Sequence, residues 1–508
     1  NLGYLTGIDK TKNDLYVQGL KSWAESKYTS PKIDAVYEYV KKGNILSDLE
    51  KSEVIEFDSD NHLKNEKEMV TWRVEGLGEN SGAVHEDKEL LASYGRYYLD
   101  TIDSSLGICM ISGKKERVAI QHLKGVSSFS GNAKLISAND NTNYTFRGRF
   151  ASDQEALSIG YAASQKAHNA LKWLLTNEGI SLGEKRMICW NPQGNRVPKT
   201  DLPLIFEDDN KADPTQYKVK LEDILLRCKK MLPESETVVI AAFEAATSGR
   251  LSLTYYNELS GSDYLDRLYY WGSTCCWSSS FWGVKSPSLF QIINCAYGTL
   301  SGAGDNIKIE VSNKKLFGQQ LQRLISCRVD KQRFPLDMMV SLVHKASNLQ
   351  IYTSNNREKL LITTCAAIRK YRYDHHKEEW DMALEENKND RSYQFGRLLA
   401  IMEKIERDTY DGDEKRETNA IRSQAFFVQR PLAAFDQVMT QLKTGYYPKL
   451  PNAARGYYDK MIGSILEKIS ECNQEEIGKP LAETYLLGYY LQKNALYTKK
   501  EKMDTEEE

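Results

Sequence analysis

Residues 237–256, T-V-V-I-A-A-F-E-A-A-T-S-G-R-L-S-L-T-Y-Y, decide the fold class of this 508-residue chain. Residues with high strand preference dominate Thr237–Phe243 and Leu251–Tyr256, and Ser248–Arg250 supply a turn between the two runs. The flanking candidates are strands at 187–190 and 204–206 and helices at 336–347 and 357–372. Strands interleaved with helices predict an α+β central region.

The rest of the sequence predicts about three domains, at roughly 150 residues per domain. Residues 1–105, with a helix candidate at Ile33–Gly43, indicate the remainder of a mixed α/β N-terminal domain, and residues 106–381 form the central α+β domain. Residues 382–508 have a wholly helical pattern, which predicts a C-terminal all-α helical bundle. Its helix candidates are 391–408, 431–444, 453–471 and 480–497. Because the chain begins at Asn1 without Met, we expect further residues before it in the natural protein.

The composition is that of an ordinary globular protein, with 41% hydrophobic and 27% charged residues. The longest apolar run, Thr237–Ala246, is far shorter than the roughly 20 residues of a membrane span, which predicts a protein without membrane helices. Nine scattered cysteines without a C-x-x-C pair predict reduced thiols and a cytoplasmic location. The net charge of −2, taken alone, argues against a polyanionic partner.

Two segments nevertheless carry a local charge of +5, namely 109–150 and 308–345. In the first, Ile108–Ile111 and Val118–Ile120 are strand candidates around a turn at Ser112–Lys115. A capping box, Ser152 with Glu155, then predicts the start of a helix that continues to Asn177. A basic loop therefore runs into the N-terminus of a helix.

The loop Asn139–Phe150, N-D-N-T-N-Y-T-F-R-G-R-F, alternates amide, aromatic and guanidinium groups. Such groups bind base edges, stack on bases and contact phosphates, although the same pattern also suits a polar surface loop. The candidate DNA-binding residues are Lys114, Lys115, Arg117, Lys124, Asn141, Asn143, Tyr144, Phe146, Arg147 and Arg149. The candidate phosphate contacts in the second segment are Lys308, Lys314, Lys315, Arg323, Arg328, Lys331 and Arg333.

Standard catalytic motifs are absent from the sequence: it has no P-loop, no G-x-G-x-x-G after a strand, no H-E-x-x-H and no G-x-S-x-G. Asp374–His376 with Glu378 and Glu379 could imitate a metal cluster, but a solvated helix end is the more common explanation. Cys275–Cys276, between two tryptophans, indicates buried thiols rather than a redox pair. We therefore expect no catalytic residue, no metal and no cofactor.

Several stretches in a consistent order resemble the large subunit of the type I-C CRISPR surveillance complex, Cascade. In the first three quarters they are G-I-C-M-I-S-G at 107–113, I-Q-H-L-K-G-V at 120–126, N-A-K-L-I-S-A-N at 132–139, S-G-R-L-S-L-T-Y-Y at 248–256 and F-P-L-D-M-M at 334–339. In the helical part they are S-Y-Q-F-G-R-L-L-A-I-M-E-K-I-E at 392–406, Y-Y-D-K-M-I-G-S-I-L at 457–466 and L-L-G-Y-Y-L-Q-K-N-A-L-Y-T-K-K at 486–500. The resemblance extends over about 400 residues.

The resemblance implies a noncatalytic subunit of an antiviral ribonucleoprotein complex. Guide RNA would supply specificity by base pairing, while this chain reads the protospacer-adjacent motif (PAM) in double-stranded DNA, promotes opening of the duplex into an R-loop and holds the displaced strand. Its implied partners are the guide RNA, the target DNA, the backbone and guide-processing subunits of Cascade, a small helical subunit and the helicase-nuclease that degrades the DNA.

The same resemblance implies that the C-terminal bundle corresponds to the Cascade small subunit. Lys377–Glu379 can be encoded by a purine run at a suitable distance before Met382, so Met382 is a candidate internal start, although Lys-Glu-Glu is also a common charged triplet. Arg391, Arg397 and Lys404 are the candidate contacts of the bundle with the displaced strand.

Two other functions stay open from the sequence. The first is a metal-dependent nuclease with an unrecognised site near Asp374–Glu379. The second is a protein-only interaction module, which the nearly neutral total charge would suit.

Overall fold

The structure is a computed structural model, and it describes most of the chain. Outside the described residues are 60–61, 65, 77–81, 128–130, 138–148, 151–152, 183–184, 200–213, 280–282, 413, 415, 474 and 505–508. The chain forms two compact units, here called the N-terminal unit (1–123 and 136–169) and the C-terminal unit (124–135 and 170–508). The two are described separately below.

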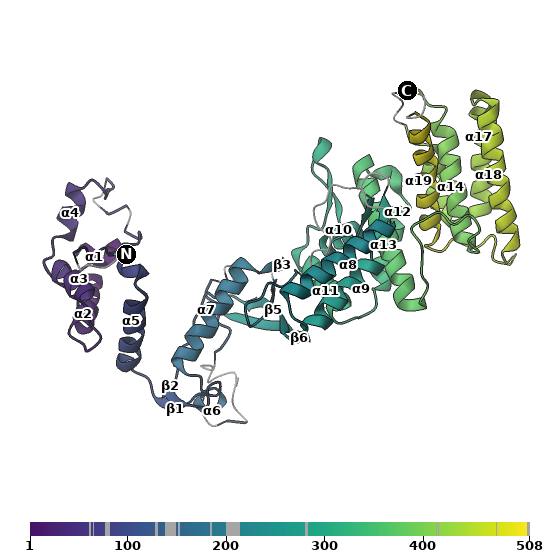
Figure 1. The fold of residues 1–508 in the computed structure, drawn as a ribbon. Helices are drawn as coiled ribbons and strands as arrows, with labels where there is room; N and C mark the ends of the chain where they lie inside the picture. Colours follow the sequence, from purple (N-terminus) through teal and green to yellow (C-terminus); the bar gives the residue numbers. More distant parts are fainter. Residues whose placement is uncertain are drawn as a thin grey trace. The chain divides into compact units, whose positions relative to one another are not determined.

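The N-terminal unit begins with a helical region (Figure 1). Its elements are α1 (Leu2–Leu5), α2 (Lys10–Ala24), α3 (Pro31–Lys41), α4 (Ile45–Lys51), η1 (Val84–Glu86) and α5 (Lys88–Thr101). Ser30 caps α3 and Pro31 fits its first turn, which explains the predicted helix at 33–43. Asp87 caps α5 and also accepts an ion pair from the buried Lys32 at 2.8 Å. In the described part of 1–105, the β pairing consists of isolated bridges, such as Phe57 with Leu63.

A short hairpin follows, formed by β1 (Leu106–Ile108) and β2 (Lys115–Arg117). The expected strands, 108–111 and 118–120, are displaced by about three residues, because the turn occupies 109–114 and uses Gly113 at φ +67°. The expected single helix from Ser152 is also wrong. It is divided into α6 (Asp153–Ala156) and α7 (Tyr161–Asn177).

The interruption between α6 and α7 has a clear cause in backbone pairing. The Ala119 N–H donates to the carbonyl of Ile159 at 2.8 Å, and the Met110 N–H donates to that of Ser158, also at 2.8 Å. Residues 157–160 therefore pair with the hairpin instead of continuing a helix, which fixes the hairpin to the start of α7.

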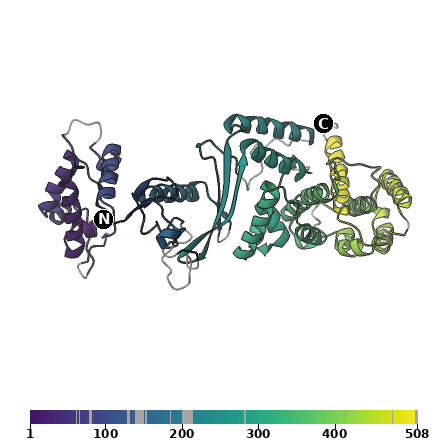
Figure 2. The same ribbon diagram turned by 90° about the horizontal axis from the view of Figure 1, so that it is seen from below.

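The C-terminal unit contains an antiparallel sheet of order β3-β4-β5-β6, whose two longest strands are visible in Figure 2. The strands are β3 (Ile180–Leu182), β4 (Lys185–Trp190), β5 (Thr237–Thr247) and β6 (Arg250–Ser260). The predicted strands at 187–190, 237–243 and 251–256 are confirmed, and each is longer than expected. The predicted strand at 204–206 lies outside the described residues.

Helices and three-residue strands complete the middle of this unit. The helices are α8 (Pro214–Met231), α9 (Gly261–Thr274), α10 (Leu289–Tyr297), α11 (Lys314–Val329), α12 (Leu336–Ala346) and α13 (Ser354–His376), with η2 (Gly304–Asn306) and η3 (Leu349–Ile351). The short strands are β7 (Trp277–Ser279), β8 (Gly283–Lys285), β9 (Thr299–Ser301) and β10 (Lys308–Glu310). Val238, Ile240 and Ala242 of β5 are buried in a core that also contains Leu265 and Leu268 of α9. The predicted helices at 336–347 and 357–372 are confirmed.

The C-terminal region is helical, which confirms the predicted fold class. Its elements are α14 (Arg391–Arg407), α15 (Asn419–Arg422), α16 (Gln424–Gln429), α17 (Pro431–Gly445), η4 (Tyr447–Lys449), α18 (Asn452–Glu471) and α19 (Tyr485–Asp504). α14 is the central helix, since every residue of Ser392–Glu406 is buried. α19 starts five residues later than expected, because Leu481 and Ala482 donate their N–H groups to the Val428 carbonyl and the Ser392 hydroxyl.

The helical region makes polar contacts with α13 and with Ser347, the residue that follows α12. The Ser347 and Tyr485 hydroxyls are 2.6 Å apart, and Arg372 pairs with Glu483 at 2.7 Å. One hydrophobic core contains residues of the sheet, of the helices that follow it, and of α14 and α19, all within the same compact unit. The expected separate domain from residue 382 therefore stays a prediction.

Candidate nucleic-acid interface

The β1–β2 hairpin of the N-terminal unit has a firmly held turn. The Cys109 N–H donates to the Lys114 carbonyl at 2.9 Å, and the Ser158 hydroxyl donates to the Ile108 carbonyl at 2.8 Å. Hydrogen bonds from the Ser112 side chain and from the Gly160 backbone lower the pKa of the buried Cys109 thiol. Backbone hydrogen bonds and the thiol thus connect the turn to the segment that precedes α7.

Large apolar side chains project from this hairpin into solvent. Each is between 58% and 68% exposed, and together we call them the apolar tip: Leu106, Ile108, Met110 and Ile111. Exposed apolar side chains are individually common, but four within six residues on a fixed hairpin form a patch, and such patches mark binding surfaces. The sequence pattern predicts strands here and gives no indication of this exposure.

The predicted basic residues beside the apolar tip differ in availability. Lys114 and Lys115 are exposed and form no ion pair with any described residue. Arg117 is half-buried and donates to the Ser104 carbonyl at 2.6 Å, so it partly supports the hairpin. Arg149 is exposed, with its guanidinium 5.4 Å from the centre of the Phe150 ring. Asn141, Asn143, Tyr144, Phe146 and Arg147 lie outside the described residues.

Lys124 belongs to the C-terminal unit, unlike the other described members of its predicted group. It forms a β-bridge with Lys134, and Lys134 forms a second bridge with Arg250. In the sequence, Lys134 contributes only to the local charge, and Arg250 lies in a predicted turn. Pairing between segments more than 100 residues apart gives no local sequence signal.

The cations of the second basic segment also differ in availability: some are exposed, and others are buried or paired with an acidic residue. Lys308 on β10 and Lys314 and Lys315 in the first turn of α11 are exposed. Lys331 and Arg333 are exposed in the loop after α11. In contrast, Arg323 makes two hydrogen bonds with Asp337, at 2.8 and 2.6 Å, and Arg328 is only 2% exposed.

The cations predicted to contact the displaced strand hold the helical region together. Arg391 donates to the carbonyls of Ile477, Lys479 and Pro480 at 2.8–2.9 Å. Arg397 is buried and donates to the Gln492 side chain at 2.9 Å, and the buried Lys404 pairs with Asp408. Burial and these partners leave little of the three groups for a nucleic acid, so we do not carry them into the proposed interface.

Asp374, the first residue of the metal-site alternative, belongs to a buried ionic cluster, whereas His376, Glu378 and Glu379 are exposed. The Asp374 carboxylate accepts hydrogen bonds from Lys370 and Tyr270 at 2.8 Å and from the Phe334 N–H at 3.0 Å. His375 Nε2 lies 2.9 Å from the Phe334 carbonyl oxygen. No group of three or more His, Cys, Asp or Glu side chains suited to a metal occurs in the described part of the chain.

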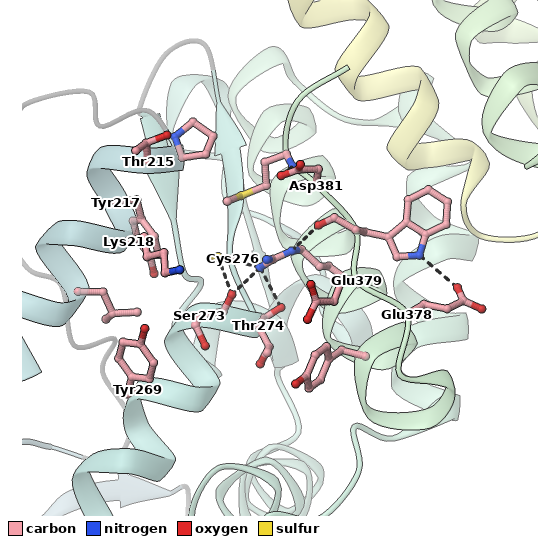
Figure 3. A pocket seen from close by; sticks show the side chains of 16 residues that line it. Thr215, Tyr217, Lys218, Tyr269, Ser273, Thr274, Cys276, Glu378, Glu379 and Asp381 are labelled. Carbon is pink, nitrogen blue, oxygen red and sulfur yellow. Dashed lines mark hydrogen bonds between the residues drawn. The ribbon is translucent and has the colours of Figure 1, made fainter. Parts of the chain in front are cut away.

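A cavity of about 480 Å³ adjoins this cluster (Figure 3). Arg369 crosses its wall and donates to the Trp380 carbonyl at 2.8 Å and the Ser273 carbonyl at 2.6 Å. These bonds fix the segment that contains Met382, the candidate internal start, to the end of α9. Burial raises the pKa of Cys275 to about 12 and also raises that of Cys276, which agrees with inert buried thiols.

The chain thus combines helices and small antiparallel sheets with exposed lysines and arginines on a hairpin, on the first turn of α11 and in loops. The family model described as CRISPR-associated protein (Cas_Csd1) matches residues 1–497. The chain belongs to this family, the large subunit of type I-C Cascade, whose members are generally noncatalytic. No curated protein sequence matches the chain significantly. Among the described residues, no helix is both long and apolar enough to span a membrane.

Proposed function

We propose that this large subunit reads the PAM in double-stranded DNA, promotes opening of the adjacent duplex and stabilises the displaced strand within Cascade. The observation that supports this most is the β1–β2 hairpin, which combines the apolar tip with two exposed lysines, Lys114 and Lys115. Proteins that bend or open DNA commonly insert apolar side chains between base steps and hold the backbone with cations.

The proposed roles of the two residue types are distinct. Lys114 and Lys115 neutralise phosphates, and the release of condensed counterions provides affinity without sequence preference. Met110 and Ile111, 58% and 64% exposed, wedge against a base step and favour its unstacking, which costs a few kcal/mol per step. The fixed turn lowers the entropy cost of placing the wedge.

A second phosphate contact is proposed at the start of α11. Lys314 and Lys315 lie in its first turn, where no acidic residue balances the positive end of the helix dipole, and Lys308 is nearby in sequence. Lys331 and Arg333 extend the same proposal to the loop after the helix. Arg323 and Arg328 have structural roles instead.

Specificity and catalysis belong to the partners in this proposal. Guide RNA provides the sequence match, backbone and guide-processing subunits carry the guide, and a helicase-nuclease recruited by this chain degrades the DNA in the cytoplasm. The chain itself supplies PAM recognition and opening of the duplex. Its net charge of −2 predicts weak binding to DNA outside the assembled complex.

The proposed second product, residues 382–508, would act as a free small helical subunit. In the full chain its Glu417 and Glu483 pair with Arg357 and Arg372, each at 2.7 Å, so the free product exposes a surface that α13 covers here. Replacing Met382 by Leu in the intact gene should abolish a short product while the full chain persists. A short product that survives this change, or coding DNA without the purine run, would defeat the proposal.

The proposed function is tested with the complex assembled with and without this chain. Binding is measured to target duplexes that carry varied flanking motifs. We expect that omission of the chain abolishes motif-dependent binding, whereas guide RNA stays bound to the backbone. Equal binding to all flanking motifs by the complete complex would contradict the proposal.

A further inference from the structure

Three cations of the C-terminal unit lie side by side across adjacent extended segments. We call Lys124, Lys134 and Arg250 the basic row. Lys124 and Lys134 form an antiparallel bridge, and Lys134 forms a parallel bridge with Arg250. The second bridge is formed by the Lys134 N–H donating to the Gly249 carbonyl at 3.1 Å and the Leu251 N–H donating to the Lys134 carbonyl at 3.0 Å.

This pairing places like charges in a costly arrangement. Bridge partners project their side chains to the same face, and neighbouring strands are about 4.8 Å apart. Like charges directly opposite each other destabilise a sheet. No member of the basic row forms an ion pair with a described residue, and Glu244 of the neighbouring β5 is paired with Lys185 at 3.2 Å.

The backbone holds the basic row in position. Val126 and Ala133, which flank the turn between its first two members, are 1% and 0% exposed. Gly125 has φ +66°, and a Cβ there would lie 2.8 Å from the Gly131 carbonyl oxygen, so only glycine suits this turn. Mobile surface lysines have no such anchors. The backbone positions of the three cations are therefore fixed by the fold.

We propose that the basic row binds the phosphodiester backbone of a nucleic acid, a site that extends and rests on the function proposed above. The row spans about 10 Å, two strand spacings. One strand of a nucleic acid carries a charge about every 3.4 Å along the axis, so this length faces about three phosphates. A single small anion would meet only two of the cations, whereas a backbone relieves the repulsion along the whole row.

The test uses the assembled complex with Lys134→Gln alone and with Lys124→Gln, Lys134→Gln and Arg250→Gln together. The matched control removes three exposed lysines of the same unit, in Lys230→Gln, Lys443→Gln and Lys460→Gln. We expect the slope of log K for target-duplex binding against log salt to fall by about 0.7 to 0.9 for each phosphate that is no longer neutralised, hence by about 2 to 3 in the triple variant. The control and Lys134→Arg should keep the original slope.

Stability of the free chain separates a binding role from a structural one. Removing the central charge in Lys134→Gln relieves repulsion, so the Tm of the free chain should rise while nucleic-acid binding weakens. A structural role predicts a lower Tm. A lower Tm in Lys134→Gln, or an unchanged salt slope together with normal guide RNA content in the triple variant, would overturn the proposal.

Two measurements identify which backbone the basic row binds. Loss of guide RNA from the purified triple-variant complex assigns it to the guide, and normal guide content with a reduced salt slope for target duplex assigns it to DNA. If only the proposal for the basic row is wrong, motif-dependent binding stays intact in the triple variant. Failure of the proposed function is different, because the unaltered complex itself then lacks motif-dependent binding.

Discussion

Gly396 of α14 lies directly against the backbone carbonyl of Tyr485 at the start of α19, so closely that a Cβ on Gly396 would overlap with that oxygen. The arrangement is reciprocal, because a Cβ on Gly488 of α19 would overlap with the carbonyl of Tyr393 on α14. Two glycines thus allow the central pair of helices to cross in backbone contact. This crossing also places Tyr489 beside Glu403, and the Tyr489 hydroxyl donates a hydrogen bond to the Glu403 carboxylate at 2.6 Å.

Gly396→Ala or Gly488→Ala should therefore destabilise the chain, although alanine is the better helix former. Forcing the helices apart costs about 1–3 kcal/mol or more, against a propensity gain of about 1 kcal/mol. The matched control is Gly463→Ala on α18, where a Cβ meets nothing within 4 Å, and it should stabilise by up to about 1 kcal/mol. Thermal unfolding measures both, and equal Tm changes in variant and control would refute the tight crossing.

The Asp374 cluster predicts a structural role without metal. Asp374→Asn leaves Lys370, whose side chain is 0% exposed, without its charged partner, and breaking such a pair costs about 3–5 kcal/mol. We expect a marked fall in Tm that chelator or added divalent metal does not alter. The metal-dependent nuclease alternative predicts DNA cleavage by the purified chain with divalent metal, abolished in a His375→Ala, His376→Ala variant.

The long regular elements were predictable from the sequence because their local signals agree with their packing. The strand runs of β5 and β6 and the helices α12, α13, α14, α17 and α18 lie within a few residues of the predicted bounds. The errors occur where tertiary hydrogen bonds override local preference. Residues 157–160 pair with the hairpin although the sequence predicts a helix, and Leu481 and Ala482 are anchored to Val428 and Ser392 before α19 begins.

The candidate site was less predictable, because the sequence shows which residues are charged but not which of them are buried or ion-paired. Lys404 and Lys115 each stand next to a glutamate in the sequence, yet only the structure places Lys404 in a buried ion pair and Lys115 in solvent. The apolar tip resembles a strand in the sequence, because exposed and buried isoleucines give the same one-dimensional pattern. The bridge from Lys134 to Arg250 depends on chain topology, which periodicity does not encode.

The ion pair between Arg323 and Asp337 predicts a defined pH dependence. Hydrogen bonding to Arg323 lowers the pKa of Asp337 from 3.8 to about 2, so the pair stabilises the fold above the unfolded pKa and this contribution disappears as the pH falls through about 2. Arg323→Gln should reduce the Tm at pH 6, and its difference from the original chain should shrink between pH 4 and 2. A constant difference down to pH 2 would exclude this linkage.

Charge reversal tests the cations of the first basic segment. Lys114→Glu, Lys115→Glu, Arg147→Glu and Arg149→Glu together should weaken target binding by the assembled complex and lower its salt slope by up to about 0.9 for each phosphate that these cations neutralise. Four reversals at other exposed lysines, in Lys218→Glu, Lys230→Glu, Lys443→Glu and Lys460→Glu, provide the control for changed total charge. An unchanged slope would remove these residues from the proposed interface.

The apolar tip is tested separately from charge by Met110→Ser with Ile111→Ser. Both side chains are exposed, so the fold should be unaffected, and the lysines keep the phosphate contacts. We expect initial duplex binding and its salt slope to persist, while strand opening beside the flanking motif, followed by 2-aminopurine fluorescence, slows about tenfold or more, since a wedge offsets part of the few kcal/mol of unstacking. Val219→Ser with Leu226→Ser, two similarly exposed positions on α8, should open the duplex at the normal rate. If the hairpin variant also opens normally, the wedge role belongs to another segment, and the apolar tip then requires a protein partner.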